Sequence, residues 1–400
     1  MKKTVIILLL VIMASSIGCT NNSIKSKNIN TYDEIRDYPY SFCDLSTGNF
    51  TVQKGNNGYY FSINNFLYFA DEDNMIAIPL CNKNNCLHDK ETDYSKLSQC
   101  NAYLLDNLIN TDFYFLNNKL YILKDESYYE GNKLVVINSI YEAQSNGTEL
   151  KKIFSVNKQI LRWIIHRGII YYATDSDGKV EGFDLSDKNT KVYFDLDAVE
   201  LYMPQLSNFF AYANNIYYCV SGFKNEKQFN DMLNGENISP FEYIYVYTAS
   251  GESNYILNSD ISEDGIVYQG FKDNCMVYTD ADYDKKIKYL YFLDQNGKRT
   301  KLDFKFENIY DLYYSDDVFT YIKTGKTIDD LEKNIFKIYD KNEKLLAAVD
   351  FPDGFANEFF IGDDRYIFYL EDKETGVKLH YIDKDNLLKG KAEINTIYSS

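Results

Sequence analysis

Several residue types that direct a chain toward other classes of protein are scarce in this one. Its 400 residues include five prolines, one tryptophan and three histidines. Lysine and arginine together number 42, against 59 aspartates and glutamates, so the net charge at pH 7 is −17. Because nucleic-acid binding needs clustered basic side chains that replace counterions, we expect no nucleic-acid partner. The charge balance instead suits a cationic partner or a divalent metal.

The common catalytic signatures are missing as well. The sequence has no HExxH, GxSxG or Walker A motif and no dinucleotide-binding fingerprint. His166 lies beside an expected turn and His380 within an expected strand, so we interpret both as structural rather than as general bases. The sequence therefore assigns no catalytic residue. Its many carboxylates leave open a glycoside-cleaving enzyme, but their separation in space cannot be read from sequence.

Only the N-terminus has an apolar run that bears on membranes. Two lysines precede the apolar residues 5–13, and small residues follow them. The run is too short for a stable span, so we expect residues 1–18 to be a cleaved export signal. Gly18 followed by Cys19 resembles a bacterial lipobox, which implies lipidation of Cys19; an ordinary signal peptide with an incidental cysteine is the alternative. Because two acyl chains give a stable anchor, we expect the protein on the outer face of the cell membrane.

A turn followed by a tyrosine-rich apolar run recurs seven times, at intervals of about 43 to 59 residues. The turn pairs are Asn64 and Asn65, Asn117 and Asn118, Arg167 and Gly168, Asn214 and Asn215, Asp273 and Asn274, Asp316 and Asp317, and Asp363 and Asp364. Asn, Asp and Gly tolerate the positive φ of a two-residue hairpin turn. The strand after each turn is largely apolar on both faces, as expected for an inner strand covered by neighbouring sheets.

These hairpins predict an all-β β-propeller, most simply with seven four-stranded blades. In the second unit, residues 134–143 and 149–156 are expected to be the third and fourth strands. Residues 19–48 are expected to be a tether, and residues 51–53 an edge strand that closes the ring. The propeller is expected to span residues 49–400, with units near 57–108, 109–158, 159–205, 206–262, 263–307, 308–354 and 355–400.

The first unit contains a cysteine and histidine segment formed by Cys81, Cys86, His88 and Cys100. Three thiols and one imidazole are the ligands of a closed tetrahedral zinc site. Outside the cytoplasm disulfides are the favoured outcome, for example Cys81 or Cys86 with Cys100 and the other with Cys43, while zinc binding and free thiols are the alternatives. Zinc binding and disulfide formation would both cross-link the irregular insertion in the first unit. A catalytic metal is not expected, because four protein ligands leave no open coordination position.

Acidic residues gather after the second strand of several units and predict an acidic rim. Asp280, Asp282 and Asp284 alternate along the chain, which could direct three carboxylates to one side and offer oxygen ligands to calcium. The glycine and distal glutamate of an EF-hand loop are missing here. Solvated acids of an ordinary hairpin are therefore the favoured interpretation, and calcium binding is the alternative.

The fourth unit carries the longest insertion, residues 222–240. Long insertions on a rigid scaffold often serve binding. This one brings Phe223, Lys224, Phe229 and Asp231 to the expected acidic rim, a mixture of apolar and charged side chains that suits an interface. We therefore predict a partner-binding loop; an insertion without a role is the alternative.

In its hairpins the sequence resembles TolB-like and kelch-like extracytoplasmic propellers. It resembles more closely a group of uncharacterised Gram-positive surface lipoproteins that share the lipobox and a Cys/His segment in the first blade. The resemblance implies a lipid-anchored surface propeller and no particular activity, because propellers host many functions. We predict a membrane-anchored binding or interaction module for a protein or glycan ligand; the alternative is a surface enzyme acting on glycans.

Overall fold

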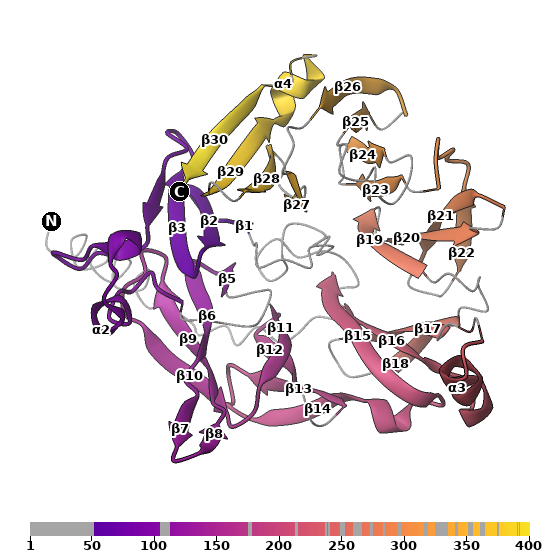
Figure 1. The fold of residues 1–400 in the computed structure, drawn as a ribbon, viewed down its shortest axis with the longest axis horizontal. Helices are drawn as coiled ribbons and strands as arrows, with labels where there is room; N and C mark the ends of the chain where they lie inside the picture. Colours follow the sequence, from indigo (N-terminus) through magenta and orange to yellow (C-terminus); the bar gives the residue numbers. More distant parts are fainter. Residues whose placement is uncertain are drawn as a thin grey trace, which may run out of the picture.

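The computed structural model describes residues 52–104, 113–174, 178–212, 215–236, 238, 241–248, 253–258, 266–272, 275–282, 285–294, 298–309, 311–315, 319–324, 335–340, 343–350, 355–360, 365–373, 376–389, 391 and 393–400. Within this part of the chain the structure is almost entirely β. Seven four-stranded antiparallel sheets follow one another around a ring in sequence order (Figure 1). The prediction of an all-β β-propeller is confirmed.

The first sheet comprises β1 (Val52–Lys54), β2 (Gly58–Ile63), β3 (Phe66–Asp71) and β4 (Ala77–Pro79). The second comprises β5 (Phe113–Leu116), β6 (Lys119–Asp125), β9 (Asn138–Gln144) and β10 (Lys151–Val156). The third comprises β11 (Ile160–His166), β12 (Ile169–Thr174), β13 (Lys179–Asp184) and β14 (Thr190–Asp195). The fourth comprises β15 (Tyr202–Tyr212), β16 (Asn215–Phe223), β17 (Phe241–Thr248) and β18 (Ser253–Asn258).

The fifth sheet comprises β19 (Ile266–Lys272), β20 (Cys275–Asp282), β21 (Ile287–Leu293) and β22 (Arg299–Leu302). The sixth comprises β23 (Leu312–Ser315), β24 (Phe319–Thr324), β25 (Ile335–Asp340) and β26 (Leu345–Asp350), and the seventh β27 (Phe355–Phe360), β28 (Tyr366–Lys373), β29 (Gly376–Asp383) and β30 (Ile394–Ser399). The short helices are η1 (His88–Lys90), α2 (Tyr94–Leu97), η2 (Leu196–Ala198), α3 (Glu226–Leu233) and α4 (Lys384–Leu388).

The predicted turns agree with the structure where it describes them, with one exception. Both residues of the Asn64–Asn65, Asn117–Asn118 and Arg167–Gly168 pairs have positive φ, between 48° and 83°. Asn215, however, belongs to β16 and pairs with Tyr212, so the fourth turn was placed one residue too late. The remaining three pairs and Asn214 lie outside the described residues.

The second sheet contains an extra hairpin that corrects the strand prediction for residues 134–143. Only Asn138–Gln144 pairs with β6 as the third strand. The residues before it form a separate two-stranded sheet, β7 (Tyr128–Glu130) with β8 (Lys133–Val135). Gly131, with a φ of 64°, supplies the left-handed backbone that this tight turn requires. The hairpin projects away from the ring (Figure 1).

The ring closes where the first and seventh sheets lie side by side (Figure 1). Each of these sheets is built from one contiguous stretch of chain, and β1 pairs with β2 rather than with the last sheet. Val52 and Gln53 do lie in an edge strand, as expected, but this strand belongs to the first sheet alone, so the expectation that it closes the ring is wrong. Side chains hold the two sheets together instead: the rings of Tyr59 and Phe368 are 4.9 Å apart, and Arg365 Nη1 lies 2.7 Å from Glu72 Oε1.

Candidate metal centre

The Cys/His segment, residues 81–101, follows the fourth strand of the first sheet, and the residues at its two ends are hydrogen-bonded to the third strand, β3. After β4, the Leu80 N–H still donates to the Leu67 carbonyl at 2.8 Å. The chain then leaves the sheet and returns at Ala102, whose carbonyl accepts from the Leu67 N–H at 2.8 Å. Tyr103 completes the return by bridging to Phe66. Because both ends of the segment are fixed to β3, its ligands are held against the first sheet.

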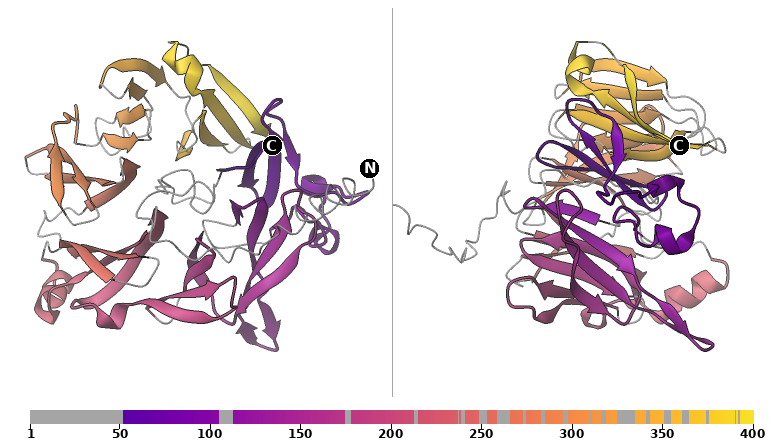
Figure 2. Two further views of the ribbon diagram at one scale, coloured as in Figure 1. Left: turned by 180° about the vertical axis from the view of Figure 1, so that it is seen from behind. Right: turned by 90° about the vertical axis from the view of Figure 1, so that its left-hand side faces the viewer.

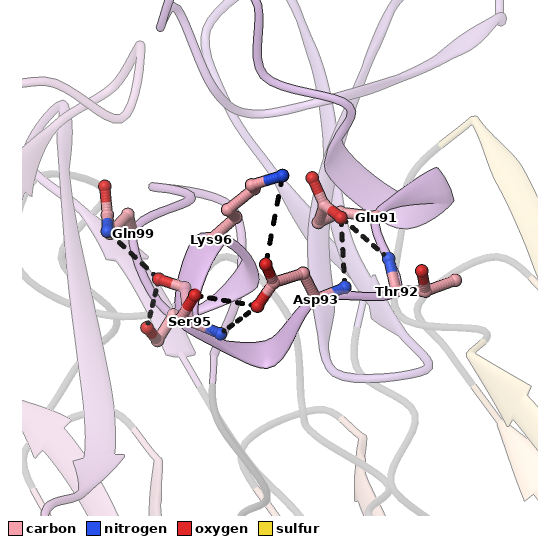
Figure 3. A network of polar contacts seen from close by, with 7 residues as sticks. Glu91, Thr92, Asp93, Ser95, Lys96 and Gln99 are labelled. Atoms are coloured by element: carbon pink, nitrogen blue, oxygen red, sulfur yellow. Dashed lines mark hydrogen bonds and ion pairs between the residues drawn. The ribbon is translucent and has the colours of Figure 1, made fainter.

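Short-range polar contacts order the segment itself (Figure 3). Asp93 caps α2, since its Oδ1 accepts from the backbone N–H of Ser95 at 3.0 Å and from the Ser95 hydroxyl at 2.7 Å. Glu91 Oε1 accepts from two successive backbone N–H groups, those of Thr92 and Asp93, both at 3.0 Å. The helix then delivers Cys100, whose N–H donates to the Leu97 carbonyl at 2.8 Å. The cap thus positions the last ligand.

The four predicted ligands converge. The Sγ atoms of Cys81, Cys86 and Cys100 and a ring nitrogen of His88 all lie within 4.8 Å of one another. Cys100 Sγ is 3.7 Å from His88 Nδ1. Zinc bonds of about 2.3 Å to sulfur and about 2.0 Å to nitrogen place tetrahedral ligand atoms roughly 3.6–3.8 Å apart. A small contraction of the cluster would therefore produce a closed zinc site.

The backbone turns tightly to bring these ligands together. Asn85 and His88 have φ values of 60° and 53°, in the left-handed region. Asn and His enter this region more readily than most residues. The turn places Cys86 and His88, two residues apart, on the same cluster of ligand atoms.

The electrostatic setting favours thiolates on one side of the cluster. Burial alone would raise the pKa of Cys81, but the backbone N–H groups of Lys83 and Asn101, together with the other two thiols, hold that pKa below its ordinary value. Burial raises the pKa of the Cys100 thiol to about 12. A metal ion would reverse that effect, because a coordinating thiol is deprotonated outright.

Two lysines lie close to the cluster. The Lys83 ammonium donates to the Gln99 carbonyl, and Lys124 donates to the Tyr103 carbonyl at 3.4 Å. Burial lowers the pKa of Lys124, while the charges of Glu126 and Cys100 act in the opposite direction. Three thiolates with Zn²⁺ carry a net charge of −1, which these cations would balance. The donor set therefore fits zinc.

The disulfide alternative finds less support in this arrangement. The thiols of Cys81, Cys86 and Cys100 are free. The fourth member of the predicted pairing, Cys43, lies outside the described residues. A disulfide would not require His88 at the cluster, whereas a four-ligand metal site does. Among the residues that the structure describes, this is the group of His, Cys, Asp and Glu side chains able to hold a metal ion.

The predicted calcium ligands are engaged with cations of the protein. Asp280 is buried in β20, where its Oδ2 lies 3.4 Å from Arg299 Nη2. Asp282 Oδ2 lies 2.6 Å from Lys285 Nζ. Asp284 lies outside the described residues. With both described carboxylates in ion pairs, the structure favours a structural role for them.

The predicted partner-binding loop differs from the expectation. Residues 222 and 223 extend β16, and the following residues fold into α3 rather than an open loop. Phe223 is buried, and the Phe229 ring packs 5.3 Å from it and 5.6 Å from Tyr202. Asp231 forms a 3.1 Å ion pair with Lys227 on the same helix. The two phenylalanines therefore fasten α3 to the fourth sheet, while Lys224 remains exposed beside it.

Cys19 and residues 1–18, which the sequence predicts to be an export signal, lie outside the described residues. In the part of the chain that the structure does describe, none of the helices combines the length and the apolar character that spanning a bilayer requires.

The sequence interpretation missed the exposed aromatic hairpin β7–β8. Tyr128, Tyr129 and Leu134 have 52%, 73% and 48% of their surface exposed. The signal that could have found it is the Gly131–Asn132 pair, a turn dipeptide between two short runs of tyrosine and aliphatic residues.

Comparison with solved structures places the chain among proteins of the same fold. It is similar to an acylaminoacyl peptidase from Pyrococcus horikoshii with a TM-score of 0.50, over 72% of this chain and 45% of the other, at 13% identity. TolB from Acinetobacter baumannii matches over 88% and 79% of the two chains at 12% identity, with a TM-score of 0.38. The β-propeller domain of the Trilobed protease from Pyrococcus furiosus matches over 71% and 81% at 14% identity, with a TM-score of 0.44.

These likenesses concern the fold alone, and the chain spans about half the length of the acylaminoacyl peptidase chain. No protein-family model matches the sequence, and no curated protein matches it. The class of protein is therefore a β-propeller, and its activity has to be argued from its own residues.

Proposed function

We propose that this chain is a lipid-anchored, extracytoplasmic propeller of seven blades that acts as a protein-binding module. The observation that carries the proposal is the β7–β8 hairpin, which exposes two tyrosines and a leucine to solvent. Exposed aromatic side chains of this kind are typical anchors of protein interfaces. The seven four-stranded sheets supply the rigid support.

The base of the hairpin is fixed, which suits a preformed binding element. The Glu126 N–H donates to the Ile137 carbonyl at 2.8 Å, closing the hairpin below β7 and β8. The Glu126 carboxylate accepts from the Ser139 hydroxyl at 2.5 Å and from Tyr141 and Lys152. Burial would raise the pKa of Glu126, but these three donors hold it below its ordinary value. Because the base is rigid, the aromatic tip loses little conformational freedom on binding.

Three appendages project from one face of the molecule. The right-hand view of Figure 2 shows the β7–β8 hairpin, α3 and the Cys/His segment on the same side. The first two follow the second long strand of their sheets, the position at which the sequence predicted a binding rim. A partner that contacts the hairpin tip would approach this face.

Site-specific photo-crosslinking tests the binding role. A photoreactive phenylalanine analogue at position 129 should capture a partner in cells, while the same analogue at Val192, which is 50% exposed on β14, should not. Tyr129→Ser should weaken binding of the captured partner roughly 30-fold or more, as expected for an aromatic anchor. Equal adducts at both positions would contradict the proposal. Capture of a polysaccharide at position 129 would favour the alternative, a module or enzyme that recognises glycans.

The anchoring part of the proposal rests on the lipobox resemblance of Gly18 and Cys19. Cys19→Ser should move the protein from the membrane fraction to the medium, because the acylated thiol is lost. Mass spectrometry of the membrane form should show a diacylglyceryl group on residue 19. An unmodified residue 19 in a protein that needs no detergent would contradict it.

We also propose that Cys81, Cys86, His88 and Cys100 hold one structural zinc ion. The purified protein should contain about one equivalent of zinc per chain, and Cys86→Ser should lower this content strongly. Cys219→Ser is the matched control, because Cys219 lies in β16 and is not one of the clustered ligands. Peptide mapping without reductant that finds disulfides among the three ligand thiols would exclude zinc.

A further inference from the structure

The contact between the first and seventh sheets is the point at which the ring of sheets closes. A cluster of buried residues spans this seam and includes Tyr59, Phe61 and Tyr68 from the first sheet and Phe368 and Leu379 from the seventh. The two sheets are joined by no shared strand among the described residues. Their association therefore depends on side-chain packing and on the contacts that bridge the outer edge of the interface between the two sheets.

The Cys/His segment lies at this outer part. Cys100 belongs to the same buried cluster, and Cys81 and Cys86 pack against it. A groove of about 500 Å³ runs between the segment and β30, with His88 and Asp89 on one side and Ile397 and Tyr398 on the other. The candidate metal site thus faces the last strand of the chain across the seam.

A polar chain crosses the seam from the metal ligands. Asp89, the residue after His88, accepts through Oδ2 from the Tyr68 hydroxyl at 3.0 Å. The hydroxyls of Tyr68 and Tyr398 are 3.3 Å apart, and their rings are 4.8 Å apart. The Tyr68 hydroxyl is the donor toward both neighbours, so its single proton serves the Asp89 carboxylate or the Tyr398 hydroxyl oxygen. The chain links β30, β3 and the residue adjoining His88.

We infer that the metal ion on Cys81, Cys86, His88 and Cys100 is the clamp that closes the propeller ring. This inference rests on the proposed zinc site. Coordination fixes the backbone at His88, and with it the carboxylate of Asp89 against Tyr68 and Tyr398. Without the metal, the left-handed backbone at His88 loses the bond that holds it, and the outer seam loosens. Each other pair of neighbouring sheets is joined by the continuing chain, whereas the seam is not.

Hydrogen exchange of the full-length protein, with zinc and after chelation, tests the clamp. Removal of zinc should raise exchange in β30 and β3 at least tenfold, while β12, which lies in the third sheet away from the seam, should change less than twofold. Asp89→Asn should keep about one equivalent of zinc and still raise exchange in β30. Asp197→Asn is the matched control, because Asp197 is an exposed aspartate of η2 that lies outside the Cys/His segment and the seam.

The possible outcomes distinguish the assignment of zinc to the four ligands from the role of that zinc in closing the ring. Protein that holds no zinc overturns the metal assignment and the clamp together. Protein that holds zinc, but whose β30 exchange is the same with and without the metal, overturns the clamp alone. Faster exchange in β30 and β3 on chelation, without a matching change in β12, supports it. Uniform loss of protection in all three strands would also overturn it, since zinc would then stabilise the fold as a whole.

Discussion

Lys288 shows how the outer part of one sheet accommodates a charge. Its ammonium group donates to the Asp311 carbonyl at 2.6 Å and lies 5.6 Å from the centroid of the Phe306 ring. Burial lowers its pKa to about 8, and the Asp311 carboxylate only partly opposes this effect. At neutral pH the folded protein therefore carries a positive charge in an environment that favours the neutral amine.

The pH dependence of stability should reveal this lysine. Between pH 8 and pH 10.5 the unfolded chain holds a proton that folded Lys288 has released, so the free energy of unfolding should rise with pH in this window, by at most about 1.4 kcal/mol per pH unit. Below pH 8 both states are protonated and the contribution is constant. Urea unfolding at pH 7 to 10 should show a rise in wild type relative to Lys288→Met. The exposed Lys151→Met control should follow wild type; a Lys288→Met profile that does so too would contradict the prediction.

At this scale the sequence predicted which residues could bind a metal, but not how other side chains are used. Closely spaced thiols and an imidazole suit a zinc site or disulfides, so Cys81, Cys86, His88 and Cys100 could be named in advance although the choice between the two could not. Phe223 and Phe229 in a polar insertion suggested a partner, yet they pack onto the protein's own sheet. Their orientation depends on a helix that the short apolar pattern of the insertion did not indicate.

The elements differ in how much local sequence determines them. Two-residue turns such as Asn64–Asn65 and Asn117–Asn118 were predictable because both residues must adopt positive φ, which few residue types tolerate. Residues 134–143 were predicted as one strand because they form an apolar run. Only Asn138–Gln144 finds a partner in β6, and the preceding residues pair within a hairpin instead. Pairing partners are tertiary information that an apolar run does not contain.

Helix α3 is an element whose stability should respond to its cap. Asn225 Oδ1 accepts from the Gln228 N–H at 3.1 Å, and Gln228 Oε1 accepts from the Lys224 N–H at 3.1 Å. An eight-residue helix is marginal alone, so this cap and the packing of Phe229 hold it in place.

Asn225→Ala should therefore loosen α3 without unfolding the propeller. Loss of an N-cap costs about 1 kcal/mol, which corresponds to roughly fivefold faster hydrogen exchange in residues 226–233. The thermal transition of the whole protein should stay within about 1 °C, because α3 lies at the periphery of the ring (Figure 1). The exposed Asn230→Ala serves as control. Unchanged exchange in α3 would show that packing alone maintains it.

At the scale of the whole molecule, neighbouring sheets join through aromatic layers. Between the third and fourth sheets the rings of Phe194 and Tyr218 stack 4.5 Å apart. Between the second and third, the Tyr114 hydroxyl donates to the Trp163 carbonyl at 2.9 Å, and their rings meet edge to face at 4.7 Å. The repeat made this architecture predictable. The seam was not, because it joins residues about 330 positions apart, such as Tyr68 and Tyr398.

A truncating mutation leaves a cavity, and the place of that cavity in the ring should decide how the molecule unfolds. Phe368 at the seam and Phe194 inside the ring are both buried, and truncation of either to alanine should cost about 3–5 kcal/mol. Trp163, the only tryptophan, reports on the interface between the second and third sheets, so its fluorescence follows loss of the main body of the ring.

Phe368→Ala should produce two separate transitions in urea. Hydrogen exchange in β30 should rise at a lower urea concentration than the one at which Trp163 fluorescence changes. The reason is that the first and seventh sheets can separate while the continuing chain still joins the other sheets. Phe194→Ala should shift both signals together, since its sheets are joined by the continuing chain and lie within the ring. Coincident transitions in both variants would mean that the ring unfolds as one cooperative unit wherever it is weakened, and that closure at the seam is no weaker than any other contact between sheets.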